Sequence, residues 1–356
     1  MKLKIAASLI IGVIVSLATL MLAFRNVPVR DLLDYVQSIN YIWIVPATAA
    51  ILISYAFKAV RWQLILGTTA RIGFWQSFHP IMIGFMINCV LPLRAGELAR
   101  PAILKKKENI PFSLGLATVA AERFFDIALL LTLFIVVLST IPLDAQAKID
   151  FAGYRLNAGD LQMVAGTMAK LSVVLFAGII FISFNATRSW LQAVLIKIPS
   201  AGAIFNKAME RPLIRICTWM NSLIENFAAG FQMLKSPKRV AACAGLSVLV
   251  WGFAALSYYI FSMGCPGINL SFWAMTAVMI IICFFITLPS APGFWGLWEA
   301  GGVFALSLFG VVAKDAAGFT LANHAIQLFP VILLGIVSAM ITSVNIIRIS
   351  YEREVP

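Results

Sequence analysis

Several charged side chains interrupt strongly apolar sequence in this chain. They are the residues best suited to bind a charged substrate or to carry a proton. Glu122, Arg123 and Asp126 interrupt the apolar run at residues 111–142. Glu122 and Asp126 are four residues apart and therefore share one face of a helix. Because an ionisable group at membrane depth costs at least about 2.5 to 3.5 kcal/mol on insertion scales, such a group indicates a function. We predict that this cluster either lines a substrate pathway or neutralises itself and ties helices together.

A second charged group lies in the motif Leu-Pro-x-Arg-x-Gly-Glu-x-x-Arg, which ends at Arg100. Pro92 and Gly96 are predicted helix breaks that expose backbone groups. The guanidinium groups of Arg94 and Arg100 can hold a phosphate through paired hydrogen bonds, so a lipid phosphate is the expected ligand. In the alternative interpretation, Arg100 contacts lipid head groups at the surface, and Glu97 pairs with Arg94 or Arg100.

Glu299 is the only charged residue between Arg239 and Lys314. It follows a turn whose predicted hinge residues are Pro289, Pro292, Gly293 and Gly296. An isolated anion at membrane depth could neutralise an amine-bearing head group, carry a coupling proton, or pair with an arginine of the second charged group. A structural ion pair is the simplest of these interpretations.

Polar residues also interrupt the last apolar run. Asn323 and Gln327 are four residues apart, so they are expected to face the same cavity, with His324 adjacent. Interhelical hydrogen bonding is the simpler interpretation for the two amides. The sequence contains no metal-ligand cluster, no nucleophile with a matched base and no phosphate-binding loop. We therefore predict no cofactor, no metal and no enzymatic activity.

The elements that hold these groups must be membrane helices. The chain has 356 residues and is 61% hydrophobic and 12% charged, whereas soluble domains are about 25% charged. About 20 residues cross a bilayer core. The apolar or nearly uncharged runs lie at residues 5–24, 35–57, 72–93, 111–142, 171–187, 240–298 and 316–347. These features predict an all-α polytopic membrane protein with a single domain over residues 1–356.

The net charge is +12, and the basic residues lie between the apolar runs. This placement argues against nucleic acid as a partner. Three segments are strongly basic and are predicted to be cytoplasmic: residues 58–71, which carry Lys58, Arg61 and Arg71, residues 94–108, and residues 188–239. The five cysteines have no paired spacing and are interpreted as small core residues.

The first two basic segments flank one apolar run, and a single crossing by residues 72–93 would separate them. We therefore predict a re-entrant hairpin over residues 72–110, since broken backbone is tolerated at membrane depth where protein or water covers it. The same logic predicts a second re-entrant hairpin over residues 271–310, entering from the other side. The result is about six full spans plus two hairpins, with both termini cytoplasmic, and eight ordinary spans is the alternative topology.

The two predicted hairpins share a local pattern of Leu-Pro followed by Gly and then Glu. Opposite entry sides and a shared pattern suggest an inverted-topology repeat, which places a substrate site near the midplane. Residues 185–239 combine scattered basic residues with apolar ones, and a cytoplasmic interfacial helical segment is predicted there. An ordinary amphipathic connector is the alternative for this segment.

Four features resemble the lysylphosphatidylglycerol synthase transmembrane, or flippase-like, family: Arg61-Trp62, the motif ending at Arg100, Glu122-Arg123-x-x-Asp126, and the proline-rich turn before Glu299. This family includes the membrane half of the multiple peptide resistance factor and many stand-alone proteins. The resemblance covers nearly the whole chain and implies lipid translocation. One departure is Phe294, which stands where the family commonly has the second glycine of Pro-Gly-Gly-x-Gly.

The resemblance implies a lipid flippase or transporter of the bacterial inner membrane, with aminoacylated phospholipid, polyprenyl-linked or other lipids as substrates. No soluble synthetase domain is expected, because few residues follow the last apolar run. Two alternatives are a lipid-binding scaffold subunit of a biosynthetic complex and an intramembrane lipid-modifying enzyme. The partners compatible with these hypotheses are a membrane lipid substrate, a second copy in a homodimer, and a lipid-biosynthesis protein.

Overall fold

The computed structural model describes most of the chain: residues 2–25, 27–67, 70–91, 94–140, 149–151, 154–156, 185–205, 210–230, 236–288 and 291–344, with four single residues between 166 and 177. This part of the chain is helical, as predicted, except for one short antiparallel hairpin. The hairpin pairs β1 (Ile149–Phe151) with β2 (Tyr154–Leu156), and Ile149 lies opposite Leu156. Most of the predicted span at residues 171–187 lies outside the described residues.

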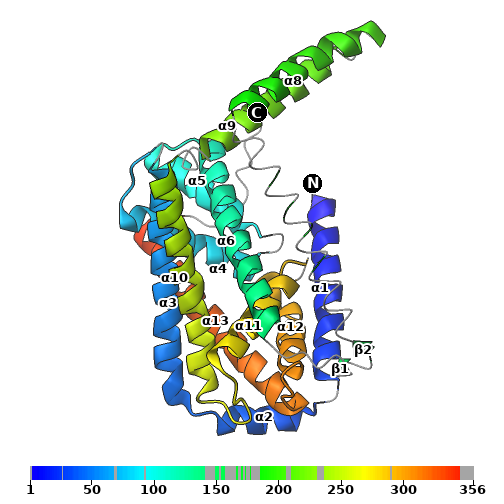
Figure 1. Ribbon diagram of the computed structural model, residues 1–356, viewed down its shortest axis with the longest axis vertical. Helices are drawn as coiled ribbons and strands as arrows, with labels where there is room; N and C mark the ends of the chain where they lie inside the picture. The colour runs from blue at the N-terminus through cyan, green and yellow to red at the C-terminus, as the bar shows by residue number, and fades with distance from the viewer. Residues whose placement is uncertain are drawn as a thin grey trace.

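Long helices run along the length of the molecule (Figure 1). They are α1 (Lys2–Phe24), α3 (Ile44–Leu66), α6 (Phe112–Thr140), α10 (Pro237–Ser262) and α13 (Ala313–Ile341). Three described segments are long and apolar enough to cross a membrane, namely Tyr41–Leu66, α10 and α13, with mean hydropathies of 1.6 to 2.0. The bent pair formed by α1 and α2 would make a fourth. These segments support a membrane-integral fold.

The apolar run at residues 35–57 does not form one continuous helix. The chain instead forms α2 (Val29–Ser38), which lies across the lower end of the molecule (Figure 1), and the short η1 helix (Tyr41–Trp43) that leads into α3. Pro28 has an extended ψ of 143° and cannot continue α1 into α2, so the two helices are bent by 76°. The Tyr35 hydroxyl donates to the Pro266 carbonyl oxygen at 2.9 Å and fixes α2 against the loop after α10.

The segment 72–110 contains two antiparallel helices, α4 (Phe74–Val90) and α5 (Gly96–Glu108), in the upper half of the molecule (Figure 1). At 1.5 Å per residue each helix is shorter than a bilayer core of about 30 Å. Gln76 Nε2 donates to Glu108 Oε2 at 2.7 Å, so the two outer ends of this hairpin lie together. Pro92, the predicted break, lies outside the described residues.

The segment 271–310 contains a second pair of short helices, α11 (Phe272–Phe285) and α12 (Leu297–Ser307), which pack on each other in the lower half of the molecule. Between them lies the 3₁₀ turn η4 (Pro292–Phe294). Pro289 lies outside the described residues. The two hairpins open toward opposite ends of the molecule, as the topology prediction requires, whereas the number of membrane crossings and the inverted repeat stay predictions.

The tips of the two hairpins meet inside the molecule. Arg94, which follows α4, donates from Nη2 to the Ile286 carbonyl oxygen at 2.8 Å, directly after α11. The same guanidinium lies 5.8 Å from the centre of the Phe294 ring in η4. The broken ends of both hairpins therefore share one location, although about 190 residues separate them in sequence.

The predicted interfacial helical segment at residues 185–239 contains two helices before α10. α8 (Asn185–Phe205) and α9 (Glu210–Gly230) pack on each other through Leu195, Cys217 and Ile224. The pair projects beyond the bundle at its upper end (Figure 1). Its placement at a membrane surface stays a prediction.

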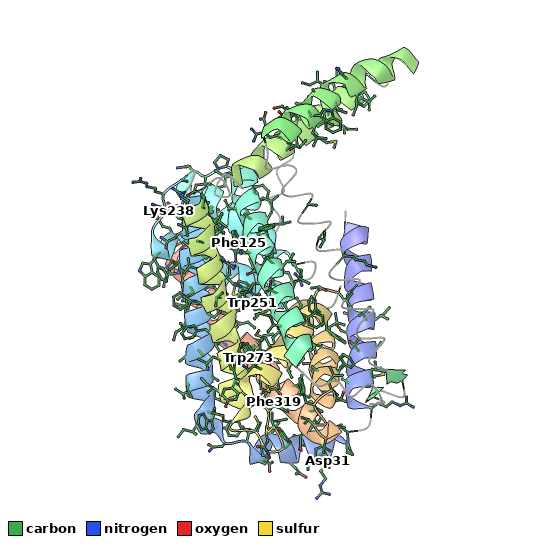
Figure 2. All side chains as sticks on the ribbon, in the orientation of Figure 1. Asp31, Phe125, Lys238, Trp251, Trp273 and Phe319 are labelled. Atoms are coloured by element: carbon green, nitrogen blue, oxygen red, sulfur yellow. The ribbon has the colours of Figure 1, made fainter. Side chains whose placement is uncertain are left out.

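Charge and apolar surface are distributed as a membrane protein requires. Lys238 lies at the upper end of the molecule and Asp31 at the lower end (Figure 2), and the C-terminal turn of α5 adds three lysines at the upper end. The sides expose large apolar residues, which include Phe329, Leu333 and Met340 on α13. Because soluble monomers rarely expose such continuous apolar surface, these sides fit a lipid environment.

Candidate functional site

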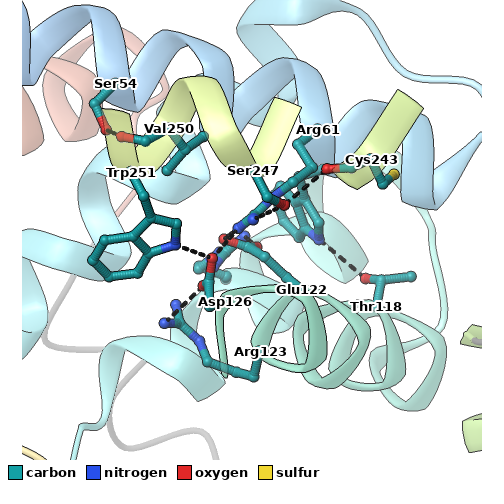
Figure 3. A network of polar contacts seen from close by, with 12 residues as sticks. Ser54, Arg61, Thr118, Glu122, Arg123, Asp126, Cys243, Ser247, Val250 and Trp251 are labelled. Carbon is teal, nitrogen blue, oxygen red and sulfur yellow. Dashed lines mark hydrogen bonds and ion pairs between the residues drawn. The ribbon is translucent and has the colours of Figure 1, made fainter. Parts of the chain in front are cut away.

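A buried network of polar contacts joins three helices (Figure 3). Its centre is Arg61 of α3, which is fully buried. Arg61 Nη2 lies 2.7 Å from Asp126 Oδ1 and 3.3 Å from Glu122 Oε1, both on α6. Arg61 Nη1 donates to Ser247 Oγ of α10 at 2.7 Å. One arginine thus links α3, α6 and α10.

Arg100 adds α5 to the network. Its Nη2 lies 2.5 Å from Glu122 Oε2, and its guanidinium stacks 4.2 Å from the centre of the Trp62 ring. Trp62 Nε1 in turn donates to Thr118 Oγ1 at 3.1 Å. Glu122 therefore lies between two arginines, and this arrangement is the self-neutralising cluster that the sequence offered as one of two interpretations.

The more accessible side of the network carries Arg123 and Glu97, whose side chains are 31% and 21% exposed. Arg123 Nη2 lies 3.2 Å from Glu97 Oε1, and its Nη1 lies 3.3 Å from Asp126 Oδ2. Trp251 Nε1 donates to Asp126 Oδ1 at 3.0 Å (Figure 3). This side of the network is where a substrate could reach charged groups.

Two sequence expectations about these residues are wrong. Lys58 and Arg61 were assigned to a cytoplasmic loop, but α3 continues to Leu66 and buries both. Arg100 is buried against Glu122 rather than exposed to head groups, and Glu97 pairs with Arg123 rather than with an arginine of its own motif. The dipeptide Arg61-Trp62 in the family resemblance was the available signal for Arg61, because it marked this arginine as part of a motif.

Lys58 lies one helical turn before Arg61 and was also missed as a candidate residue. It is 7% exposed. Its ammonium nitrogen lies 4.7 Å from the centre of the Phe85 ring, 5.6 Å from that of Tyr55 and 5.8 Å from that of Trp251. Within the part of the chain that the structure describes, no carboxylate forms an ion pair with it.

The charges of this region do not balance. The cations are Lys58, Arg61, Arg100 and Arg123, and the anions are Glu97, Glu122 and Asp126. With every group ionised, four positive and three negative groups leave one positive charge. Aromatic rings attract a cation through their quadrupole but supply no counter-charge. All three carboxylates of this group are therefore paired with arginines rather than with Lys58.

A second buried site lies at the break of the second hairpin. Glu299 Oε1 lies 2.6 Å from His324 Nδ1 of α13, so histidine takes the place of the arginine that was one of the alternatives offered for Glu299. Glu299 Oε2 accepts from the Gly296 backbone N–H at 2.7 Å and caps α12. His324 Nε2 lies 2.9 Å from the Gly293 carbonyl oxygen. His324 is thus a central residue of this site, although the sequence placed it only beside Asn323 and Gln327.

The two amides of α13 occupy different environments. Gln327 Nε2 donates to Ser257 Oγ of α10 at 2.9 Å, which is the interhelical hydrogen bond expected for it. Asn323 is fully buried and interacts with the Tyr258 side chain, although among the described residues neither of its amide atoms has a partner that satisfies strict hydrogen-bond geometry. Trp298 Nε1 is likewise unpartnered within this set. The region thus holds polar groups that a bound molecule could satisfy.

The predicted site residues therefore fall into two clusters, joined through Arg94 at the meeting point of the hairpins. The upper cluster contains the charged residues of α5 and α6, and the lower one contains Glu299 and the polar residues of α13. The described residues contain no group of three or more His, Cys, Asp or Glu side chains arranged to hold a metal ion. All five cysteines are free thiols.

Long apolar helices around a buried, charge-paired interior place this chain among the helical polytopic membrane proteins. The chain belongs to the lysylphosphatidylglycerol synthase TM region family, whose profile matches residues 9–335. The resemblance noted in the sequence is thereby confirmed.

Curated relatives are distant in sequence. A UPF0104 membrane protein of Methanocaldococcus jannaschii is 23% identical over 96% of each chain. Glycosyltransferase AglD of Haloferax volcanii is also 23% identical over 95% of this chain, but the match spans only 55% of AglD. A UPF0104 membrane protein of Methanothermobacter thermautotrophicus is 22% identical over 79% of this chain and 77% of its own length. No solved structure matches the chain significantly.

Proposed function

We propose that this protein moves a lipid with an anionic phosphate group across the membrane, with the head group passing between the tips of the two hairpins. The observation that carries the proposal is the buried excess positive charge at Lys58. A buried cation without a counter-ion is costly. A phosphodiester carries one negative charge at neutral pH, and this charge matches the deficit.

The position of Lys58 supports this assignment. Its ammonium is enclosed by rings from α3, α4 and α10, and these aromatic surfaces also suit the apolar part of a lipid. Arg123, on the accessible side of the network, and Arg94, at the meeting point of the hairpins, are the two further cations proposed to contact the phosphate. Arg100 is not assigned this role, because Glu122 and Trp62 occupy its guanidinium.

The opposed hairpins support translocation rather than binding alone. We propose that both are re-entrant, so that each tip reaches the membrane centre from a different side. Broken helices of this kind carry the substrate sites of many secondary transporters, which work by alternating exposure of one central site. On this proposal both termini are cytoplasmic, the membrane is a cytoplasmic one, and the protein performs no covalent chemistry.

The family and the relatives suggest two substrate classes. The family description refers to lysylphosphatidylglycerol, and a glycosyltransferase shares this membrane region. We therefore include aminoacylated phospholipids and sugar-carrying polyprenyl lipids among the candidates. Both classes carry phosphate, which is the group that the Lys58 site is proposed to bind.

The experiment is a translocation assay in liposomes containing the purified protein. Fluorescent phosphatidylglycerol and phosphatidylcholine analogues are compared, with the outer-leaflet fluorophore destroyed by dithionite and ion gradients imposed in turn. The protein is expected to accelerate movement of the anionic analogue. In Lys58→Met, which keeps the apolar stem, this movement should fall at least about tenfold, since a hydrogen bond to a charged group contributes about 1.5 to 3 kcal/mol.

The matched control is Lys106→Met. Lys106 is an exposed lysine at the end of α5, so its loss should leave transport within the error of the assay. Movement of no analogue under any gradient would overturn the proposal. Equal rates in Lys58→Met and wild type would show that the anion does not bind at Lys58.

The scaffold hypothesis remains the second candidate because of the projecting α8–α9 pair. This pair exposes Trp190, Ile196 and Ile216, which a partner protein or a membrane surface could cover. Deletion of residues 188–228 separates the two hypotheses. A scaffold would lose its partner, whereas the proposed transporter would still move lipid in liposomes that contain no other protein.

A further inference from the structure

Glu299 and His324 are in contact in a way that fixes the number of protons they hold. A backbone carbonyl oxygen can only accept a hydrogen bond, so His324 Nε2, at 2.9 Å from the Gly293 oxygen, must carry hydrogen. The 2.6 Å contact between His324 Nδ1 and Glu299 Oε1 also needs one hydrogen between the two atoms. The pair therefore shares one proton beyond the hydrogen on Nε2 and has no net charge.

Loss of this shared proton would leave a lone pair on Nδ1 facing a carboxylate oxygen, and a net charge of −1 in a fully buried place. Among the described residues no lysine, arginine or aspartate forms an ion pair with either member. Because an uncompensated buried charge is costly, the observed contact exists only with the proton bound.

The proton also holds two elements together. His324 belongs to α13, while Gly293 and Glu299 flank the break of the second hairpin. Both Gly293 and Gly296 have positive φ, at 73° and 86°, so this turn has a backbone that few other residues would adopt. The hydrogen bonds of the pair fix the turn on α13, and losing the proton would release it.

We propose that Glu299 and His324 form a proton-binding site that locks the tip of the second hairpin onto α13, and that lipid movement is coupled to this proton. The coupling half of this proposal rests on the proposed lipid transport, whereas the proton site stands on geometry alone. The released tip also carries Phe294, which lies against Arg94 of the first hairpin. Protonation of one site thus acts on the proposed lipid site through a direct contact.

The surroundings of the pair supply few other titratable groups. Trp298 stacks on the His324 ring with centroids 4.5 Å apart, and Tyr258 of α10 stacks on Trp298 at 6.4 Å. The other ionisable groups from neighbouring elements are Cys283 of α11, and Cys89 and Arg94 of the first hairpin. Residues Ser16 and Thr19 of α1, which lie against the turn, do not titrate.

On this proposal the proton enters beside Trp295. Its ring lies 4.5 Å from that of His324, and Trp295 is 37% exposed. Trp295 is thus a partly exposed neighbour of the buried His324 ring. A proton taken up from water on this route would be released to water when the turn leaves α13.

The first test uses the fact that the chain has only two histidines. In a His79→Gln background with ¹⁵N-labelled histidine, ring-nitrogen NMR reports on His324 alone. We expect Nε2 to stay protonated while the Nδ1 resonance shifts as the pH rises and the shared proton leaves. In Glu299→Gln the Nδ1 shift should disappear, because the amide donates permanently to Nδ1. An identical titration in both proteins, or an unprotonated Nε2, would overturn the proton site.

The second test measures coupling in the liposome assay. A gradient of one pH unit, coupled to one proton per lipid, supports about a tenfold difference in lipid distribution between leaflets. Wild type and His79→Gln are expected to show this asymmetry, and Glu299→Gln is expected to lose it while still binding the anionic lipid. Asymmetry that persists in Glu299→Gln would overturn the coupling.

The two tests also separate this inference from the proposed function. Absence of any lipid movement, together with the expected NMR titration, would reject transport and keep the proton site. Lipid movement that ignores the gradient, together with the same titration, would reject only the coupling.

Discussion

Buried charged side chains in this protein are stabilised by partners that lie far away in the sequence. Glu122 is buried between Arg61 and Arg100, which come from two other helices. Breaking a buried ion pair by removing one partner costs more than the pair itself contributes, because the remaining charge is left uncompensated. The network is therefore a constraint on folding as well as a candidate site.

Replacement of Glu122 by Gln is expected to destabilise the protein by about 3 to 5 kcal/mol, because two buried arginines would lose their carboxylate. Thermal unfolding in detergent measures this loss. Glu97→Gln is the matched control, since Glu97 is partly exposed and its ion pair with Arg123 should contribute about 1 kcal/mol or less. Equal melting temperatures for the two variants would contradict the central role of Glu122.

Phe294 is the clearest case of local strain, because it has a φ of 63°, a conformation that disfavours bulky residues. Phe294→Gly and Phe294→Ala remove the same ring, and only glycine relieves the backbone. We expect Phe294→Gly to be more stable than Phe294→Ala by about 1 kcal/mol in thermal unfolding. The same pair of changes at Phe304, inside α12, should give the opposite order, because glycine weakens a helix.

At the scale of elements, close approach of backbones sets the shape of the first hairpin. The Gly96 N–H donates to Asn88 Oδ1 at 2.8 Å, and a methyl group on Gly96 would collide with the Gly84 carbonyl oxygen. Gly84 itself lies against the Arg100 side chain. The glycines thus let α5 pack close enough to α4 for Arg100 to reach Glu122.

Gly96→Ala is expected to destabilise the protein by about 1 to 3 kcal/mol, because the added methyl group overfills the contact between α4 and α5. Gly252→Ala in α10 is the control, since a methyl group there meets no atom within 4 Å, and it should stabilise the helix by about 0.5 to 1 kcal/mol. Opposite shifts in melting temperature are the expected result. Two shifts of the same sign would indicate that helix propensity, and not close packing, determines the stability change of Gly96→Ala.

At the scale of the whole molecule, two short hairpins enter from opposite ends and meet inside a set of long helices. An odd number of crossings between two basic segments would place one of them on the wrong side of the membrane. The hydrogen bond between Gln76 and Glu108 brings the two outer ends of the first hairpin to one place. The arrangement thus predicts which surface positions lie on the same side of the membrane.

Labelling of single cysteines introduced into a cysteine-free background measures this topology. Arg71→Cys and Lys106→Cys are expected to react from one side of sealed vesicles, and Asp34→Cys and Lys314→Cys from the other, since all four positions are exposed. Reaction of Arg71→Cys and Lys106→Cys from opposite sides would instead show that the chain between them crosses the membrane, as the eight-span topology requires.

The sequence by itself determined the class of this protein and the residues worth attention. Membrane helices, the α4–α5 and α11–α12 segments and the family could all be predicted, because hydropathy, charge placement and motif order are properties of contiguous sequence. Helix boundaries were less certain. The burial of Lys58 and Arg61 was missed because a basic residue at the end of an apolar run resembles the start of a loop.

Only the tertiary structure decided which charged side chains form ion pairs, and that Lys58 forms none among the described residues. The partners of Arg61 lie about 60 residues away on α6, and those of Glu299 on α13, so no local pattern could assign them. The excess charge at Lys58 emerges only after Arg61, Arg100 and Arg123 are paired with carboxylates. The sharing of one proton by Glu299 and His324 follows from a carbonyl oxygen that backbone geometry places on the ring. Pairing depends on distances in space, and packing of distant helices sets those distances.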